Sequence, residues 1–215
     1  MKDLSNYRRS YEKSQLVEEN LPDNPIMLFK SWFLETENLG FHGEVNAMTV
    51  STIGLDGFPK SRVVLLKQFN EEGFVFFTNY NSEKGRAIEA NPKICLSFFW
   101  GEAERQVIIK GKAEKVPANI SDGYFESRPV GSRLGAIVSP QSEVIPSRSY
   151  IEKNLAETEK QYEGAAEIPR PDHWGGYIVK PVELEFWQGR PNRLHDRIRY
   201  KLQEDYNWKI ERLAP

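Results

Sequence analysis

Short runs of β-branched and aromatic residues, separated by tight turn sequences, most constrain the fold of this chain. Residues 47–53, 61–69 and 74–78 are such runs, and Gly54-Leu55-Asp56-Gly57 and Asn70-Glu71-Glu72-Gly73 separate them. Runs of this composition are typical of β-strands, and turns of this length join antiparallel neighbours. The pattern therefore predicts an antiparallel meander.

The rest of the chain continues this pattern and adds helices. Asn24 followed by Pro25 predicts the start of an amphipathic helix that ends near Gly40, and Ser82 predicts the cap of a short helix through Ala90. Further strands are expected at residues 94–100, 106–116, 177–187, 197–202 and 208–213, and helical pieces at 118–163 around a long loop at 138–148. Six or seven strands without βαβ alternation predict an α+β, mainly β fold, an antiparallel barrel with surrounding helices.

Composition narrows the class of protein. The aromatic content of 12% predicts a folded core, and the net charge of -2 gives no bulk attraction to nucleic acid or an anionic membrane. No stretch reaches the ~18 consecutive apolar residues of a membrane span, and the first 15 residues lack the apolar region of a secretion signal. We therefore expect a cytoplasmic protein with no nucleic-acid or membrane partner.

Several common chemistries lack their motifs. The chain has no G-x-G-x-x-G, no G-x-x-x-x-G-K-[ST] and no G-x-S-x-G, which disfavours dinucleotide, nucleoside triphosphate and serine-hydrolase sites. His42, His173 and His195 lie far apart in sequence and, with the lone Cys95, form no spaced ligand set, so we expect no metal.

Cationic, amide and hydroxyl side chains gather instead at the ends of predicted strands, as a phosphate ester requires. Arg62 and Lys67 fall on opposite faces of a strand, and alone they favour solvated strand ends. Residues 78–84 run from a strand into a helix start, where hydroxyls, N–H groups and Lys84 can converge on an anion, or Ser82 can simply cap a helix.

Two further groups carry the same ambiguity. Tyr124 and Arg128 share a face of a predicted helix, with Ser132 just beyond, which fits a second phosphate cradle or a surface Tyr–Arg stack. The amides of Gln106 and of Gln141-Ser142 suit the edge of a polar heterocycle, although such residues are more often solvated.

Residues 185–197 predict a strand, a turn and a second strand. If this segment is extended, Arg193, His195 and Arg197 alternate onto one face. Three such groups repel one another unless an anion or an electron-rich ring lies opposite, so the cluster favours a functional site.

Together these segments closely resemble the pyridoxine/pyridoxamine 5'-phosphate oxidase family, in order and over nearly the whole chain. The motifs are R-V-V-L-L-K, F-F-T-N with S-x-K, E-R-Q-V, Y-F-x-S-R-P-x-x-S, S-x-Q-S, E-F-W-Q-G with R-L-H-D-R, and W-K-I-E-R-L-A-P. The resemblance implies an FMN-binding split barrel and a homodimer with FMN at the subunit interface. It also implies oxidation of pyridoxine and pyridoxamine 5'-phosphates by O2 to pyridoxal 5'-phosphate, with a mobile segment at residues 1–20 preceding a single domain at 21–215.

The resemblance also implies residue roles. FMN-binding roles fall on Arg62, Val63, Val64, Leu65, Leu66, Lys67, Phe77, Thr78, Ser82, Lys84, Gln106, Gln141, Ser142, Trp187 and Arg197. Substrate-binding roles fall on Arg8, Arg9, Ser10, Tyr11, Lys67, Tyr124, Arg128, Ser132, Arg193 and His195, of which Arg193 and His195 are also the expected catalytic residues.

One position departs from the family pattern: Glu83 stands where many relatives carry an arginine. A carboxylate cannot donate to phosphate, so we expect Glu83 to turn toward solvent and Arg62 and Lys84 to carry more of the FMN affinity. Two rival functions remain: a split-barrel flavin reductase with another substrate, and a non-catalytic module that binds flavin or pyridoxal phosphate.

Overall fold

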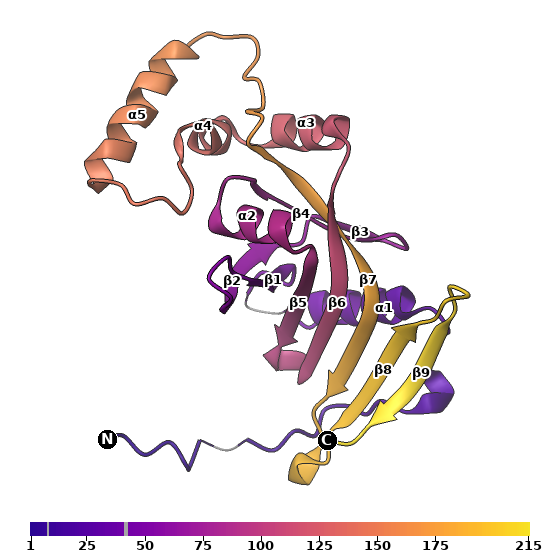
Figure 1. Cartoon of the computed structure of the whole chain (residues 1–215). Helices are drawn as coiled ribbons and strands as arrows, with labels where there is room; N and C mark the ends of the chain where they lie inside the picture. Colours follow the sequence, from indigo (N-terminus) through magenta and orange to yellow (C-terminus); the bar gives the residue numbers. More distant parts are fainter. Residues whose placement is uncertain (8, 41–42) are drawn as a thin grey trace. The chain divides into compact units, whose positions relative to one another are not determined.

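The computed structural model describes residues 1–7, 9–40 and 43–215. The described strands are β1 (Ala47–Ile53), β2 (Pro59–Leu65), β3 (Gln68–Asn70), β4 (Gly73–Asn79), β5 (Lys93–Trp100), β6 (Arg105–Lys115), β7 (Trp174–Gln188), β8 (Asp196–Leu202) and β9 (Trp208–Leu213). The α-helices are α1 (Pro25–Asn38), α2 (Glu83–Ala90), α3 (Ala118–Ser127), α4 (Val130–Val138) and α5 (Arg148–Gln161), and short 3-10 turns are η1 (Glu18–Asn20), η2 (Gly101–Ala103) and η3 (Pro191–Arg193). Figure 1 shows these elements along the chain.

The strands form one hydrogen-bonded sheet in the order β2-β1-β5-β6-β7-β4-β3, with β8 paired to β7 and β9 to β8. The pairings β3–β4, β4–β7, β7–β8 and β8–β9 are antiparallel. The chain forms two compact units, unit 1 (Met1–Val50, Cys95–Gly111 and Pro181–Pro215) and unit 2 (Ser51–Ile94 and Lys112–Lys180). The single domain at 21–215 stays a prediction.

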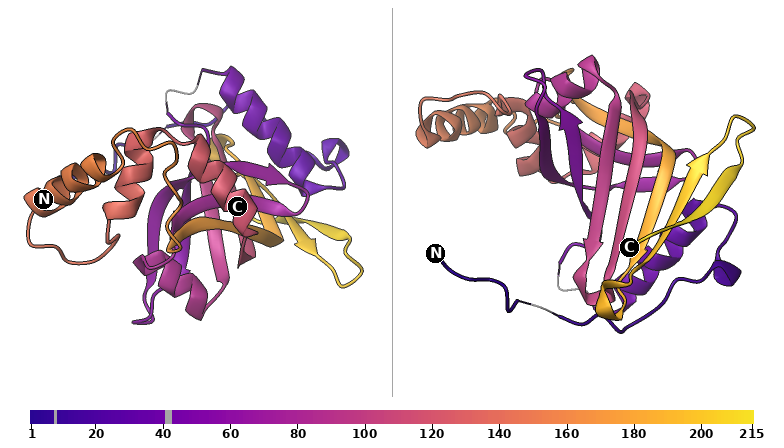
Figure 2. Two further views of the ribbon diagram at one scale, coloured as in Figure 1. Left: turned by 90° about the horizontal axis from the view of Figure 1, so that it is seen from above. Right: turned by 60° about the horizontal axis from the view of Figure 1, so that its bottom comes forward.

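Unit 1 is built on α1 and the β7–β8–β9 ladder, in which Phe186 pairs with Ile198 and Arg197 with Leu213. The side chain of Asn24 accepts a hydrogen bond from the Ile26 N–H at 2.9 Å, which confirms the predicted helix start. Phe29 and Trp32 form the buried face of α1, where Phe29 contacts Phe98 and Trp32 meets Phe186 edge to face. Both views of Figure 2 show the β8–β9 hairpin of this unit.

Unit 2 contains β4, the first half of β7 and the helices α2 to α5. Phe74 pairs with Val179 and Asn79 with Trp174 along the β4–β7 ladder. A hydrophobic core joins α3, α4 and β7, and consists of Phe125, Leu134, Ile168 and Trp174. The predicted helical pieces and the loop that begins after α4 are confirmed.

Two expectations about the strands were wrong. The single strand expected at 61–69 is interrupted at Leu66 and Lys67, because the Lys67 N–H donates to the Val75 carbonyl and residues 68–70 then pair with β4. A single strand can contain polar residues such as Lys67 and Gln68, so the sequence gives no sign of the change in pairing. The break divides one of the eight expected ranges in two, and the nine described strands also exceed the six or seven expected for the barrel.

Candidate active site

A cavity of about 970 Å³ lies within unit 2, between β2, β4, the start of α2 and the α3–α4 segment. Its lining includes Lys60, Arg62, Val63, Val64, Leu65, Lys67, Phe77, Thr78, Glu83, Lys84, Tyr124, Arg128, Ser132, Gln141 and Ser142. The structure therefore gathers most of the cofactor residues and four of the substrate residues expected from the sequence into one hollow. A volume of this size accommodates a cofactor-sized ligand.

Lys84 provides the most deeply placed charge of this cavity. The residue is 8% exposed, and its ammonium donates to Thr78 Oγ1 at 3.2 Å and to Gln141 Oε1 at 3.1 Å. Burial first, and then the nearby positive charge of Arg62, lower the pKa of Lys84 to about 8. At neutral pH the ammonium is thus charged but poorly compensated, which favours an anionic ligand.

Ser82 caps α2, and the residues that follow it, Glu83 and Lys84, line the cavity. Its hydroxyl donates to the Asn79 carbonyl at 2.6 Å and accepts from the Gly85 N–H at 3.2 Å. A Cβ at Gly85 would collide with the Tyr80 backbone, so glycine permits this tight approach of helix and strand. The capping interpretation of Ser82 is confirmed, and neither Ser82 nor the buried Leu66 is among the residues that line the cavity.

A second cationic group lies in the same cavity. Phe77, Tyr124 and Trp174 stack, with ring centroids 4.0 Å apart for Phe77 and Tyr124. The Lys67 ammonium lies 6.0 Å from the Tyr124 ring, and the Arg128 guanidinium lies 4.7 Å from the Trp174 ring. Cations over aromatic faces keep their positions while their N–H groups stay available to a ligand.

Arg128 has an unsatisfied donor. Its Nη1 atom is buried and has no hydrogen-bond partner within the described part of the chain, and burial lowers the pKa of this arginine. Buried N–H groups without a partner are rare in folded proteins, so this atom marks a place for an acceptor. The expected helical Tyr124–Arg128 pair was wrong in one respect: α3 ends at Ser127, and Arg128 follows in extended conformation.

Unit 1 holds the other predicted residues. The Trp187 ring lies 4.6 Å from the His195 ring, and Tyr11 meets Trp187 edge to face at 5.7 Å. Tyr11 also packs on Gly189 so closely that a Cβ there would collide with the Tyr11 side chain. Tyr11, Trp187 and His195 therefore form an aromatic group at the β7–β8 turn.

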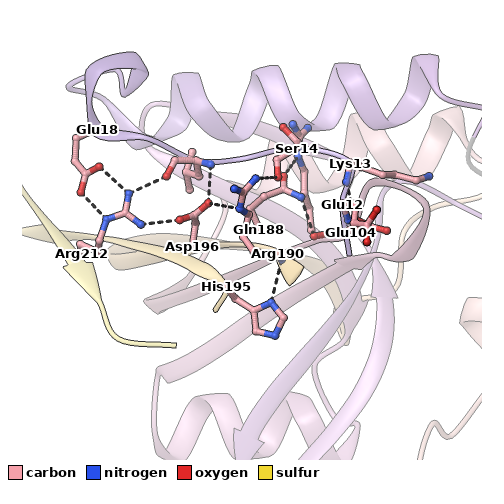
Figure 3. Close-up of polar contacts among 12 residues, drawn as sticks. Glu12, Lys13, Ser14, Glu18, Glu104, Gln188, Arg190, His195, Asp196 and Arg212 are labelled. Carbon is pink, nitrogen blue, oxygen red and sulfur yellow. Dashed lines mark hydrogen bonds and ion pairs between the residues drawn. The ribbon is translucent and has the colours of Figure 1, made fainter. Parts of the chain in front are cut away.

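A charged network fixes the N-terminal segment beside this turn (Figure 3). Asp196 accepts a hydrogen bond from the Leu16 N–H at 3.0 Å and from Arg212 at 2.8 Å, and its carboxylate lies 3.6 Å from Arg190 Nε. Arg212 also pairs with Glu18, which lowers the pKa of that carboxyl to about 2. Sequence reasoning missed this network, because these charges stand far apart in the chain and read as solvated.

The network extends to the N-terminal backbone and to His195. Arg190 donates to the Ser14 carbonyl at 3.0 Å, and the Glu104 carboxylate accepts the N–H groups of Glu12 and Lys13. The Arg190 N–H lies 3.1 Å from His195 Nδ1 and acts as its donor. Neutral His195 therefore carries its proton on Nε2. Burial and then Arg193 lower the pKa of His195, opposed by Asp196, and this keeps the ring neutral near pH 7.

The turn before His195 is not extended, which corrects the expected alternation of Arg193, His195 and Arg197. Asn192 and Arg193 adopt left-handed conformations with φ of 57° and 62°. Such conformations cost non-glycine residues roughly 1–3 kcal/mol each and cluster at functional sites. Arg193 is exposed, whereas Arg197 lies in β8 and donates to Glu185 at 2.8 Å.

The remaining predicted residues are placed as follows. Gln106 is half-buried in β6 of unit 1, and Arg9 and Ser10 are exposed. Arg8 lies outside the described residues. Glu83 is not simply turned to solvent: it forms an ion pair with Lys60 at 2.5 Å. No helix in the described ranges is long and apolar enough to cross a bilayer.

Comparison with known proteins identifies the class first. The chain is similar to the solved structure of PhzG from Burkholderia lata in complex with tetrahydrophenazine-1-carboxylic acid, with a TM-score of 0.84 and 29% identity over 93% of this chain and 98% of that one. It also shares the fold of an FMN-binding protein from Nostoc punctiforme, with a TM-score of 0.70 at 14% identity over 91% of this chain and all of that one. The fold is an antiparallel split β-barrel with surrounding helices, as expected.

The family then follows from the sequence matches. Residues 34–162 match the pyridoxamine 5'-phosphate oxidase family, and residues 174–215 match the pyridoxine 5'-phosphate oxidase C-terminal dimerisation region. The chain is 71% identical, over its full length and that of the relative, to the pyridoxine/pyridoxamine 5'-phosphate oxidase of Flavobacterium johnsoniae. It is 50% identical to that of Thermosynechococcus vestitus over 99% of both chains. The chain belongs to the pyridoxine/pyridoxamine 5'-phosphate oxidase family of oxidoreductases.

The Asp196 network generates a first prediction. We expect Asp196→Asn to speed tryptic cleavage after Lys13 by on the order of tenfold, because it removes the charge from the acceptor of the Leu16 N–H and of Arg212. Timed proteolysis followed by mass spectrometry measures this rate. Asp205→Asn, which alters an exposed carboxylate bonded to Asn207, is the control. Equal cleavage of the Asp196 variant and the parent would show that the network does not hold the segment.

Proposed function

We propose that the chain oxidises pyridoxine 5'-phosphate and pyridoxamine 5'-phosphate to pyridoxal 5'-phosphate, with FMN as cofactor and O2 as electron acceptor. The products are pyridoxal 5'-phosphate and hydrogen peroxide, with ammonia from the amine substrate. The identity of 71% to a full-length relative of that name supports this proposal. We also keep the cytoplasm as the expected location, because charged phosphate esters do not readily cross membranes.

The residues of unit 2 fit FMN. Arg62 and Lys84 supply positive charge beside the capped start of α2, which suits the terminal phosphate. Val64, Leu65 and Thr78 supply apolar and hydroxyl surface suited to a flavin ring, and Gln141 and Ser142 supply polar groups for its edge. We propose that Gln106, Trp187 and Arg197 complete the pocket. When bound, FMN supplies the electron acceptor for the substrate and passes the electrons to O2.

The unsatisfied Nη1 of Arg128 is the observation that carries the proposal for the substrate. A cavity for FMN alone needs one phosphate site, whereas Lys67, Tyr124, Arg128 and Ser132 offer donors for a second anion in the same cavity. FMN carries one phosphate and pyridoxine 5'-phosphate carries another, so the two ligands together need two anion sites. A clamp on the unreactive phosphate orients the reacting carbon, and this proximity is a large part of catalysis.

We propose that Arg193 and His195 act on the pyridine end of the substrate. Neutral His195 offers an Nε2 proton to a ring substituent, and Arg193 supplies positive charge where electron density builds up. Tyr11 and its neighbours Arg8, Arg9 and Ser10 belong to the N-terminal segment, which we propose closes over the bound substrate. The match to a dimerisation region supports a homodimer, and we propose that FMN binds at its subunit interface.

Aerobic turnover tests the proposed function. The purified protein with FMN should consume O2 and form pyridoxal 5'-phosphate and hydrogen peroxide in equal amounts from either substrate. An oxygen electrode and the absorbance of the product measure this. A protein that binds FMN and substrate without O2 consumption would instead be a binding module, and one that reduces flavin only with another donor would be a reductase.

The roles in the substrate clamp give a second prediction. Arg128→Ala should raise the Michaelis constant for pyridoxine 5'-phosphate about 10- to 100-fold and lower turnover less, because it removes charge-assisted hydrogen bonds to the unreactive phosphate. Steady-state kinetics measure both constants, and Arg148→Ala in exposed α5 serves as the control. An unchanged Michaelis constant would leave Arg128 as part of the aromatic stack alone.

The role of Arg193 gives a third prediction. Arg193→Ala should lower turnover about 100-fold while FMN stays bound, because it removes a charge that acts in the transition state. Stopped-flow or steady-state rates and the visible flavin spectrum of the same sample measure both effects. Arg193→Lys should keep part of the rate, since it retains the charge but not the planar fork. Turnover equal to that of the parent would exclude the catalytic role.

A further inference from the structure

Lys60 and Glu83 bring two opposite charges to the cavity that Arg62 and Lys84 also line. Lys60 lies two residues before Arg62 in β2, and the period of a strand puts the two on the same face. Both line the cavity together with Glu83 and Lys84, the first two residues of α2. Three cations and one carboxylate therefore gather there.

Glu83 is electrically coupled to all three cations. It forms the ion pair with Lys60 at 2.5 Å, and its negative charge opposes the lowering of the pKa of Arg62 and of Lys84 by burial. When all four groups are ionised they carry a net charge of +2. A phosphate monoester carries about −1.5 to −2 near pH 7, so the balance is matched only if the charge of Lys60 is included.

An ordinary surface ion pair is the alternative. Exposed lysine–glutamate pairs contribute little to stability, and the Lys60 and Glu83 side chains are 56% and 40% exposed. The chain offers a matched example in Lys115, a strand lysine that pairs with Glu89 of the same helix α2 at 3.3 Å. Lys115 and Glu89 do not line the cavity. Of these two ion pairs, only Lys60–Glu83 is therefore placed to reach a ligand in the cavity.

We propose that Lys60 is a third cationic ligand of the FMN phosphate, beside Arg62 and Lys84, and that Glu83 holds the Lys60 ammonium at the cavity. The inference rests on the proposed binding of FMN. It explains how a carboxylate is tolerated next to Lys84: Glu83 donates nothing to the phosphate, but it positions a cation from the neighbouring strand that does. The phosphate then receives charge from both β2 and α2.

Titrations of the full-length protein, freed of flavin by dialysis, test this inference. Quenching of flavin fluorescence gives the dissociation constants of FMN and of riboflavin, which lacks the phosphate. Lys60→Met should weaken FMN binding about 10-fold or more, as expected for a charge-assisted hydrogen bond, and leave riboflavin binding unchanged. Lys115→Met should change neither constant.

The variant Glu83→Gln separates direct binding from simple neutralisation of Glu83. The introduced glutamine removes the charge but keeps an amide oxygen that accepts a hydrogen bond from the Lys60 ammonium, so Lys60 stays at the cavity. If Lys60 binds the phosphate, Lys60→Met should therefore still weaken FMN binding in the Glu83→Gln background. If the double variant binds FMN as tightly as Glu83→Gln alone, Lys60 only masks Glu83 and the inference is overturned. If the parent binds FMN more tightly than riboflavin and Lys60→Met does not change FMN binding, only the inference is refuted. If the parent binds neither flavin, the proposed function is refuted as well.

Discussion

The buried ammonium of Lys84 is the interaction on which the arrangement of unit 2 depends. Its nearby partners, Thr78 and Gln141, offer neutral dipoles, while burial and Arg62 both disfavour its charge. A bound anion offsets the free energy cost of this buried charge. The buried Nη1 atom of Arg128, which has no hydrogen-bond partner in the described structure, likewise favours an anion at a second place in the cavity. The fold therefore maintains two poorly compensated cations in one cavity, which favours the binding of anionic ligands there.

In unit 1, the main constraint is the hydrogen bonding of the N-terminal segment. The N-terminal segment before α1 has no strand partner among the described pairings, and side chains of other elements supply partners for several of its peptide groups. Glu104 and Asp196 accept its N–H groups, and Arg190 and Arg212 donate to its carbonyls. Arg190 of this network also donates its backbone N–H to His195 Nδ1, so the network that holds the N-terminal segment includes the residue that sets the tautomer of His195 (Figure 3).

Local patterns predicted the elements well and the polar contacts poorly. The cap of α1 at Asn24 and the strand at 208–213 follow from residue type and periodicity, because their causes are local. The sequence did not predict the break at Leu66 and Lys67 or the left-handed turn at Arg193, because hydrogen-bond pairing and backbone conformation decide both and residue type does not specify them there. Contacts such as Leu16 to Asp196 and Lys60 to Glu83 join residues distant in sequence, and family motifs name the site residues without revealing these supports.

The most direct test of the central claim is the visible spectrum of the FMN-loaded protein under anaerobic conditions. Pyridoxamine 5'-phosphate should bleach the flavin band, and admission of air should restore it with pyridoxal 5'-phosphate formed. That result follows if the two cation groups of the cavity hold cofactor and substrate together. A flavin band that persists with both the amine and the alcohol substrate would contradict the account and identify a binding module or a reductase with another donor.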